Sequence, residues 1–343
     1  MTTVLVGAQY GSEGKGVVAH RILVDAINEK KPFSVCIRTG GPNAGHTFVH
    51  EGKKVVVQTV PCGLADPNCE LLLGPGAVIN PRQLAREIEM LEALGFDIRS
   101  RLYVDERATV LTMEHENQEG HTHGSMHAAI GSTGEGVGAA RAARMSRSGD
   151  RILVQDRKDE FCDLMVTDTV NRHKGRMLLE GTQGSGLSLV HGPWPYTTSA
   201  DTNAAQFCAD AGVSPLSVRE VALVARTMPI RVAGNSGPLY KELTWEQLSE
   251  RLGMQVVEHT TVTKKRRRIG EWDQALFDRA VQLNRPTWVA LTFMDYVNPA
   301  DRLVTQWDKL SCEGLEFIKK ISIPVRYAGT GVHDTDGWTC LRA

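Results

Sequence analysis

The stretch Val4-Leu5-Val6-Gly7-Ala8-Gln9-Tyr10-Gly11-Ser12-Glu13-Gly14-Lys15-Gly16 is the most informative part of the sequence about the type of fold. Its apolar start is typical of a buried strand, and residues 17–27 continue with the apolar spacing of a helix. A strand, a glycine turn, a lysine and a helix together hold a phosphate chain, because backbone N–H groups, the helix N-terminus and the lysine all face the anion. A Walker A motif has Gly in place of Gln9 and Ser or Thr in place of Gly16, so a tight turn without a ligand is the alternative.

The composition is that of a globular chain with local anion sites. The 343 residues are 41% hydrophobic and 23% charged, and the net charge is -1. No overall basic field is available for non-specific binding of nucleic acid. Seven scattered cysteines without a C-x-x-C pair, and no signal peptide or apolar run of membrane-span length, predict a cytoplasmic protein without a membrane partner.

Strands and helices alternate along the chain. A β-hairpin is expected at 47–60, and helices are expected after Asn80 and Thr244. Further apolar strands are predicted at 33–38, 101–105, 176–180, 218–225, 288–293 and 325–331. This alternation predicts an α/β fold resembling P-loop NTPases, with a mainly parallel central sheet, helices on both faces and glycine-rich active-site loops. No linker or repeat is evident, so residues 1–343 are expected to form a single domain.

Five turns rich in glycine or hydroxyl side chains are assigned to strand ends. Open α/β sheets bind ligands at the carboxyl ends of their strands, so these turns predict a site for more than one phosphate-bearing ligand. The alternative interpretation is that the glycines only close the loops and that the turns bind no ligand. The candidate ligand contacts in these turns are Lys15, Asn43, His46, Gln183 and Thr198. His46 lies between glycine turns and is a candidate general acid near phosphate, a purely structural role being the alternative.

The segment 114–147 is predicted to be largely a polar loop. It contains four histidines, but their spacing matches no ligand pair on a helix and no cysteine is near, which disfavours zinc. These histidines are His115, His121, His123 and His127. Three arginines at helical spacing follow, and they form either a solvated face or a contact to phosphate. They are Arg141, Arg144 and Arg147.

The run Lys264–Arg268 is the one strongly basic stretch. A nucleic-acid patch and a solvated surface are two interpretations of it. The third, which we prefer, is a site for a small dicarboxylate, because arginine binds a carboxylate through two parallel hydrogen bonds and the preceding threonines offer hydroxyls.

In this order the turns resemble those of the adenylosuccinate synthetase family. Its N-A-G-H-T occurs unchanged at 43–47, and its G-D-E-G-K-G resembles residues 11–16. Residues 132–138, 180–184, 194–199 and 262–270 are similar to four other family segments. In the same order, these segments are T-T-G-x-G-I-G, E-G-A-Q-G, Y-P-x-x-T-S and T-T-G-R-x-R-R-x-G. The likeness therefore extends from residue 4 to about residue 331.

The resemblance implies a reaction and a set of site residues. In that family a nucleoside triphosphate phosphorylates the 6-oxygen of a purine monophosphate, and the aspartate amine then displaces phosphate. The implied catalytic residues are Ser12, Lys15, His46 and Gln183. The purine monophosphate would be held by Ser12, Asn43, Thr133, Arg147, Gln183, Thr198 and Lys265. Arg147 would reach the nucleotide of the neighbouring subunit, which implies a homodimer.

The same resemblance assigns the other ligands. The triphosphate would be held by Gly14, Lys15, Gly16, Val17, Thr47, Arg267, Asp295, Gly329 and Gly331. Aspartate would be held by Thr263, Lys265 and Arg267, and the cofactor Mg²⁺ by Ser12 and Gly45.

One departure from the family pattern bears on the substrate. Ser12 stands where the family has the aspartate that removes the purine N1 proton and ligates magnesium. Guanine carries a 2-amino group next to N1, and a short hydroxyl both makes room for that group and accepts its hydrogen bond. A phage-type branch of the family, the 2-aminoadenylosuccinate synthetases, has the same serine and acts on dGMP. The chain resembles this branch most, which would place it in the cytoplasm of a phage host.

The predicted activity is therefore ligation of L-aspartate to dGMP with ATP or dATP. Lys265 replaces the arginine that faces the ribose and Lys264 replaces a glycine, which agrees with a sugar lacking its 2′-hydroxyl. The family's guanine-reading T-K-L-D is Thr292-Phe293-Met294-Asp295 here, and its lost lysine favours ATP or dATP over GTP. Two alternatives are ordinary adenylosuccinate synthesis from IMP and GTP, and a nucleotide-binding regulator that lost catalysis with Ser12.

Overall fold

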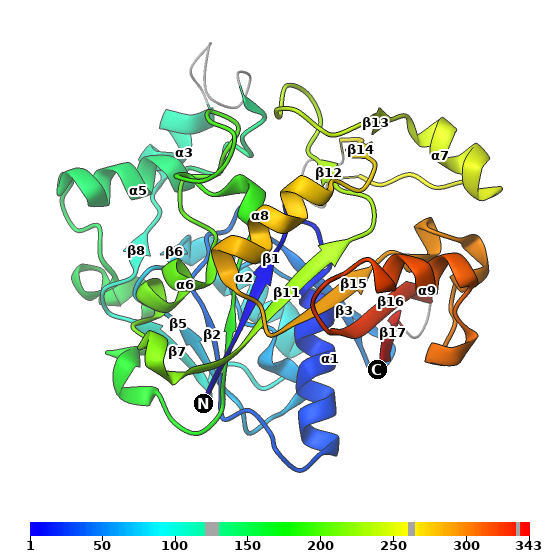
Figure 1. The fold of residues 1–343 in the computed structure, drawn as a ribbon. Coiled ribbons are helices and arrows are strands. Elements are labelled where there is room, and N and C mark those ends of the chain that lie inside the picture. Colours follow the sequence, from blue (N-terminus) through cyan, green and yellow to red (C-terminus); the bar gives the residue numbers. More distant parts are fainter. Residues whose placement is uncertain (121–129, 260–264, 334–336) are drawn as a thin grey trace.

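The computed structural model describes residues 1–120, 130–259, 265–333 and 337–343, and its centre is a ten-stranded sheet (Figure 1). The strand order is β17-β16-β15-β11-β1-β10-β2-β5-β7-β9, and only the β16–β17 pair is antiparallel. The strands are β1 (Thr2–Gly7), β2 (Val35–Arg38), β5 (Glu70–Leu73), β7 (Leu102–Asp105), β9 (Met165–Thr167), β10 (Met177–Glu180), β11 (Val218–Arg226), β15 (Trp288–Thr292), β16 (Val325–His333) and β17 (Gly337–Arg342). The predicted α/β fold with a mainly parallel sheet is confirmed.

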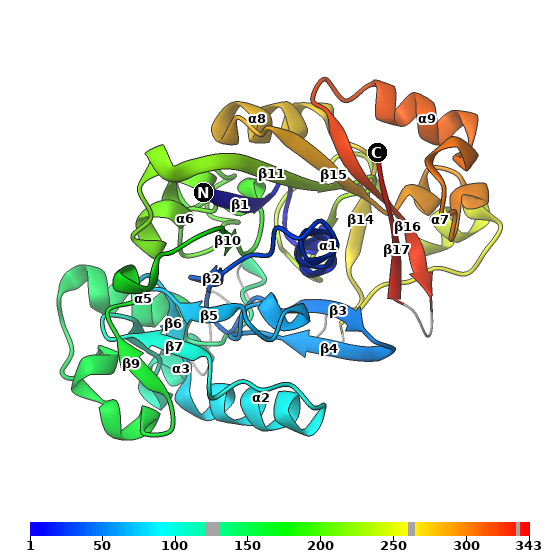
Figure 2. The same cartoon turned by 90° about the horizontal axis from the view of Figure 1, so that it is seen from below.

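Helices cover both faces of this sheet (Figure 2). One face packs against α1 (Lys15–Asn28) and α2 (Pro81–Ala93). The other packs against α6 (Ala204–Ala211), α8 (Gln274–Asn284) and α9 (Cys312–Lys319). Along β1, Leu5 belongs to the first core cluster, and Val4 and Val6 belong to the second. Burial on both faces explains why this strand is a continuous apolar run rather than an alternating one.

Local signals set several element boundaries where they were predicted. Asn80 is the N-cap of α2, and its side chain accepts from the backbone N–H of Gln83 at 3.3 Å. Thr244 and Gln247 form a capping box at the start of α7 (Trp245–Leu252). The predicted hairpin consists of β3 (His46–His50) and β4 (Lys53–Val57), joined by residues 51–52, which both have positive φ.

Two smaller sheets flank the central one. β6 (Val78–Ile79) pairs with β8 (Thr109–Val110), and β14 (Arg268–Gly270) lies between β12 (Ile230–Arg231) and β13 (Glu242–Leu243). The three-stranded sheet shares a separate apolar cluster with α7. Within the described ranges, the helices lack the combination of length and apolar character that crossing a bilayer requires.

The expectation of a polar loop over 114–147 is wrong in part. Residues Met113–Gly120 form helix α3, where His115 is buried and its Nδ1 accepts from the backbone N–H of Thr112 at 3.2 Å. The other three histidines of the predicted cluster lie outside the described residues. Helix α5 (Val137–Ser146) contains Arg141 and Arg144, but it ends before Arg147, whose φ of 53° is left-handed.

The buried carboxylate of Glu87 gives a test of how the hairpin is anchored. It extends from α2 and accepts from the backbone N–H groups of Gln58, Thr59 and Val60 at 2.8–3.1 Å. Glu87→Ala leaves these N–H groups without a partner, so we expect the free energy of unfolding to fall by about 3 kcal/mol. Urea denaturation measures it. Glu89→Ala, at an exposed position of the same helix, should change stability by less than about 0.5 kcal/mol; equal losses would contradict this anchoring role.

Candidate active site

The carboxyl ends of neighbouring parallel strands form the edge on which the predicted residues gather. β16, β15, β11, β1, β10 and β2 follow one another in the sheet. The predicted turns after β1, β2 and β10 do begin at strand ends. The other two do not: residues 131–138 lead into α5, and 194–199 lie between a 3-10 helix, Ser185–Leu187, and α6.

The turn after β1 is built around a buried carboxylate, that of Glu13. Its Oε1 accepts from the backbone N–H groups of Gln9 and Gly11 at 3.1 and 2.8 Å, and its Oε2 accepts from Lys15 Nζ at 2.6 Å. Lys15 Nζ also donates to the backbone carbonyl of Gln183. Gly14 has a φ of 85° and is the N-cap of α1, so Lys15 stands at the first turn of the helix.

The first turn of α1 lies against the start of β3. A Cβ at Gly16 would come within 2.8 Å of the Cβ of His46 and 3.0 Å of the backbone nitrogen of Thr47. Glycine at this position therefore allows the helix N-terminus to approach His46. Val17 follows half-buried on the helix, and Gly45 precedes His46 at an exposed position.

His46 belongs to a buried polar network. Its Nδ1 lies 2.7 Å from Arg38 Nη1, 3.3 Å from Glu180 Oε2 and 3.5 Å from the sulfur of Cys62. Arg38 is a donor only, so its shorter contact assigns Nδ1 as an acceptor and places the proton of the neutral ring on Nε2. The arrangement leaves His46 with one N–H for a ligand.

The charges around His46 keep its ring neutral. Burial first, and then the Arg38 cation, lower the pKa of His46 to about 4. Burial opposes ionisation of Glu180, but its contact with His46 and the charge of Arg38 hold the pKa of this carboxyl below its usual value. At neutral pH, His46 therefore acts as a hydrogen-bond donor rather than as an imidazolium.

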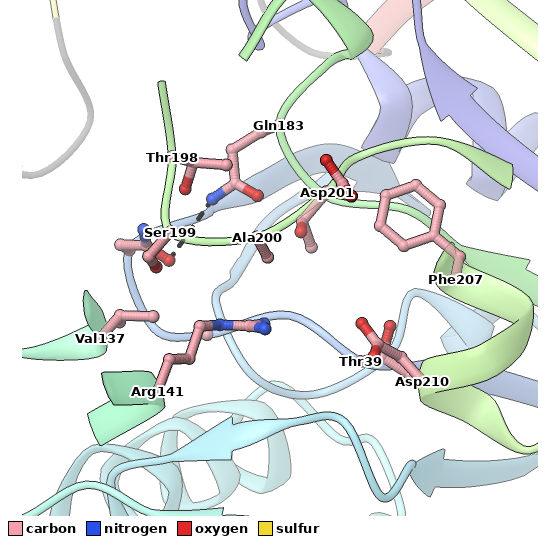
Figure 3. A pocket seen from close by; sticks show the side chains of 13 residues that line it. Thr39, Val137, Arg141, Gln183, Thr198, Ser199, Ala200, Asp201, Phe207 and Asp210 are labelled. Atoms are coloured by element: carbon pink, nitrogen blue, oxygen red, sulfur yellow. Dashed lines mark hydrogen bonds between the residues drawn. The ribbon is translucent and has the colours of Figure 1, made fainter. Parts of the chain in front are cut away.

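Several predicted nucleotide-binding residues line one pocket (Figure 3). Asn43, Gln183 and Thr198 all face it, and Gln183 Nε2 lies 3.4 Å from Asn43 Oδ1. Thr133 and Arg147 are not among its lining residues. Thr133 is half-buried in the turn before α5, and Arg147 is exposed at the end of that helix.

Ser12 and Arg267 are in direct contact although 255 positions separate them. Nη1 of Arg267 donates to the Ser12 hydroxyl, and Nη1 of Arg226 donates to the Ser12 carbonyl at 3.2 Å. Glu258 binds Arg226 at 2.5 and 3.2 Å, and its carbonyl accepts from the backbone N–H of Arg267 at 2.9 Å. Exposed Ser12, with a φ of 58°, is thus fixed by two arginines.

Asp295 and Gly331 meet at the β15–β16 end of the same edge. A Cβ at Gly331 would lie 3.4 Å from Asp295 Oδ2. Oδ1 of Asp295 is buried without a partner among the described residues, and burial raises the pKa of this carboxyl to about 6. Thr292, also at this end, donates to the Glu13 carbonyl at 2.8 Å and so links it to the turn after β1. Gly329 is buried in β16.

The other predicted aspartate-binding residues are less well placed. Lys265 is exposed beside the start of β14, and Thr263 lies outside the described residues. The ring of Phe293, at the position of the family's lysine, lies under the guanidinium of Arg226 at 3.8 Å.

Sequence reasoning missed the charged residues that hold the site together. Arg38, Glu180 and Arg226 each end an apolar strand. A single charge that closes an apolar β-branched or leucine-rich run is the signal that would have found them, because such a side chain reaches the ligand edge of the sheet.

One group of donor atoms in the described part of the chain has the composition of a metal site. Ligand atoms of His46, Cys62 and Glu180 lie within 4.8 Å of one another. The Arg38 cation is already bound there, and burial raises the pKa of the Cys62 thiol well above its usual value. Both effects oppose a metal ion, so this group is a hydrogen-bond network.

Comparison with known proteins gives a consistent result. The family model described as adenylosuccinate synthetase matches residues 4–167 and 159–308. Adenylosuccinate synthetase of Methanocaldococcus jannaschii is 38% identical over 346 residues, covering 97% of this chain and 95% of its own length. That of Archaeoglobus fulgidus is 35% identical over 337 residues, covering 96% and 95%.

Two solved structures share the fold. Cyanophage S-2L succinoaminodeoxyadenylate synthetase, bound to dGMP and to dATP as an energy donor, is 31% identical, with a TM-score of 0.82 over 98% of this chain and 94% of that one. The fully ligated adenylosuccinate synthetase of Plasmodium falciparum is 21% identical, with a TM-score of 0.80 over 99% of each chain.

The environment of His46 predicts how its ring titrates. We expect a midpoint near pH 4 in the folded protein, against about 6.5 in the unfolded chain, so stability falls as pH decreases across this window. Two-dimensional NMR of the imidazole nitrogens measures it, with His46→Asn to assign the signals. Protonation of the folded ring near pH 6.5 would show that Arg38 and burial do not control it.

Proposed function

Since this chain belongs to the adenylosuccinate synthetase family of C–N bond-forming ligases, we propose that it joins L-aspartate to the 6-position of dGMP. ATP or dATP is the proposed phosphoryl donor. The products are N6-succino-2-amino-2′-deoxyadenylate, ADP or dADP, and phosphate. The observation that carries this proposal is Ser12, whose short hydroxyl stands at the ligand edge between Arg226 and Arg267.

The reaction proceeds in two displacements. First, N1 of the purine loses its proton and the 6-oxygen attacks the γ-phosphorus, so that the bond from this phosphorus to the β-phosphate oxygen breaks. The aspartate amine then attacks C6, loses a proton, and the 6-phosphate leaves as inorganic phosphate. Negative charge develops on the 6-oxygen and on the transferred phosphoryl group, and preorganised donors stabilise it there.

The assembled residues match these charges. Lys15, at the first turn of α1, is the cation for the transferred phosphoryl group, and it exchanges its bonds to Glu13 and the Gln183 carbonyl for phosphate oxygens. His46 donates its Nε2–H to the developing charge, with burial and Arg38 keeping the ring neutral and the contacts to Arg38 and Glu180 fixing its position. Gln183 and Asn43 hold the purine monophosphate.

The surroundings of Ser12 favour guanine over hypoxanthine. The Ser12 oxygen accepts one hydrogen bond from Arg267, and its second lone pair is available to the 2-amino group. The two carboxylates closest to Ser12 in the hydrogen-bond network, those of Glu13 and Glu258, already have hydrogen-bond partners. Glu13 binds backbone N–H groups and Lys15, and both oxygens of Glu258 bind Arg226. No described acidic group of this network thus crowds or competes for the 2-amino group.

Residues at the β15–β16 end of the edge bear on the choice of triphosphate, and oxygen atoms near the turn after β1 bear on the binding of magnesium. Phe293 packs under Arg226 and brings no cation to the base, and buried Asp295 beside Gly331 offers a carboxyl to an amino group, as adenine has. Mg²⁺ fits a site with oxygen donors. The Gly45 carbonyl and the Ser12 hydroxyl would hold it, with Ser12 leaving Arg267. Both are neutral, so the phosphates would supply the charge that the ion offsets when bound.

A second candidate is ordinary adenylosuccinate synthesis from IMP and GTP. Its support is the 38% identity to the Methanocaldococcus jannaschii enzyme, which exceeds the 31% identity to the phage protein. A regulator without catalysis has less support, because Lys15, His46 and Gln183 are brought together in a polar site.

Substrate preference tests the proposed function. Purified protein is incubated with Mg²⁺, aspartate and either dGMP or IMP, in combination with ATP, dATP or GTP, and phosphate release is measured. We expect turnover with dGMP and an adenine triphosphate, and at least tenfold lower kcat/KM with IMP, about 1.4 kcal/mol. Turnover with IMP and GTP alone would establish the second candidate, and no turnover in any mixture would favour the regulator.

Two variants of Ser12 separate its roles in this preference. Ser12→Asp restores a carboxylate, which should lower kcat/KM for dGMP and raise it for IMP, reversing the preference. Ser12→Ala keeps the space but removes the hydrogen bond to the 2-amino group. We expect its affinity for dGMP to fall roughly tenfold and its preference for dGMP over IMP to become smaller. An unchanged preference in both variants would show that residue 12 does not select the base.

The proposal of a homodimer with shared sites rests on Arg147. It is exposed at the end of α5 and outside the nucleotide pocket of its own chain, as expected of a residue that acts on a partner's ligand. Arg147→Gln and Lys15→Ala should each be nearly inactive. Mixing them should restore up to about a quarter of the wild-type activity per chain, because half of the dimers are mixed and each holds one complete site. Activity of the mixture equal to the sum of its parts would refute a contribution in trans.

A further inference from the structure

Arg141 lines the nucleotide pocket and forms no ion pair with any residue that the structure describes. It projects from α5 among the pocket-lining side chains (Figure 3). Its Nε is buried without a hydrogen-bond partner, and within the described residues no ion pair to its guanidinium is formed. A desolvated guanidinium is costly unless an anion or several acceptors meet it. The pocket therefore has a place for an anion that the protein itself does not fill.

The groups around Arg141 show which kind of anion belongs there. Thr39, Asn43 and Thr198 add hydroxyl and amide groups, which bind phosphate oxygens. The two carboxylates of the pocket are held by other groups. Asp201 accepts from the Ser188 hydroxyl at 2.6 Å and from the backbone N–H of Val190, and Asp210 accepts from the side chain of Gln206 at 2.8 Å.

The neighbouring arginine of α5 has a different role. Nη1 of Arg144 donates to the carbonyls of Pro75 and Arg107 at 3.1 and 2.6 Å and to the Thr109 hydroxyl at 2.8 Å. It joins α5 to the loop before β6, the loop before β8 and β8 itself, and it does not line the pocket. Of the two arginines within α5, only Arg141 lines the pocket.

We propose that Arg141 binds the 5′-phosphate of the purine monophosphate within its own protomer. The inference rests on the proposed function only in taking this pocket as the monophosphate site. The guanidinium donates two N–H groups to one phosphate, beside the hydroxyl and amide donors. Asp210 lies across the pocket from Arg141 (Figure 3), and these two described residues form no ion pair. Each protomer thereby neutralises its own nucleotide in part, independently of the partner's Arg147.

Calorimetry with matched ligands tests the assignment. For Arg141→Gln, we expect the affinity for dGMP to fall roughly 10- to 100-fold, and the affinity for 2′-deoxyguanosine, which has no phosphate, to stay within about twofold. Arg141→Lys keeps the charge without the two-point geometry and should fall between the two. The control is Arg219→Gln, at an exposed position of β11, which should bind both ligands as the wild type does.

Two further measurements separate this role from others. Repeating Arg141→Gln in an Arg147→Gln background should still lower the affinity for dGMP and spare 2′-deoxyguanosine, because each nucleotide would meet Arg141 of its own protomer in addition to the partner's Arg147. Asp210→Asn should bind dGMP at least as tightly as the wild type. The assignment is overturned if Arg141→Gln leaves dGMP affinity unchanged, or weakens nucleotide and nucleoside alike. IMP in place of dGMP should show the same fold-loss, so a wild-type preference for IMP would refute the proposed substrate and leave the role of Arg141 standing.

Discussion

A single buried carboxylate, that of Glu180, ties the catalytic edge together. It ends β10, and one of its oxygens accepts from the backbone N–H of Cys62 at 2.6 Å and from the thiol of Cys36 at 2.8 Å. Its other oxygen lies 3.5 Å from Arg38 and 3.3 Å from His46. Two neighbouring strands, the hairpin and the loop after it therefore meet at one anion. Because a buried charge needs its partners, each of these segments is held in one position.

Charge compensation then determines what the site does. Arg38 and Glu180 offset one another, which lets a neutral His46 remain buried with one N–H for a ligand. Glu13 and Lys15 offset one another in the same way at the start of α1. In the proposed reaction a triphosphate would replace the carboxylate as the partner of Lys15, since a phosphate carries more charge than the carboxylate does. Opposite charges that are already in place cost little reorganisation when the substrate's charge develops.

The two ends of the edge differ in composition, and we propose that this difference separates the ligands. Around Arg141 and Asn43, threonine hydroxyls and amides favour a phosphate ester. Around Ser12, one arginine contacts the short neutral side chain and a second contacts the backbone carbonyl. At Asp295, a buried carboxyl with a raised pKa faces β16. Membership of the family defines the class of reaction, and in our proposal these local differences carry the choice of base and triphosphate.

Local patterns in the sequence predicted the fold class, the positions of most central strands along the chain, and the glycine turn between β1 and α1. These features rest on apolar runs buried on both faces, glycines with positive φ, and caps such as Asn80 and Thr244. Which charges meet depends instead on the tertiary structure. Ser12 finds Arg267, and His46 finds Glu180, across 255 and 134 positions. Pairings of that range depend on strand order in the sheet, which no local pattern encodes.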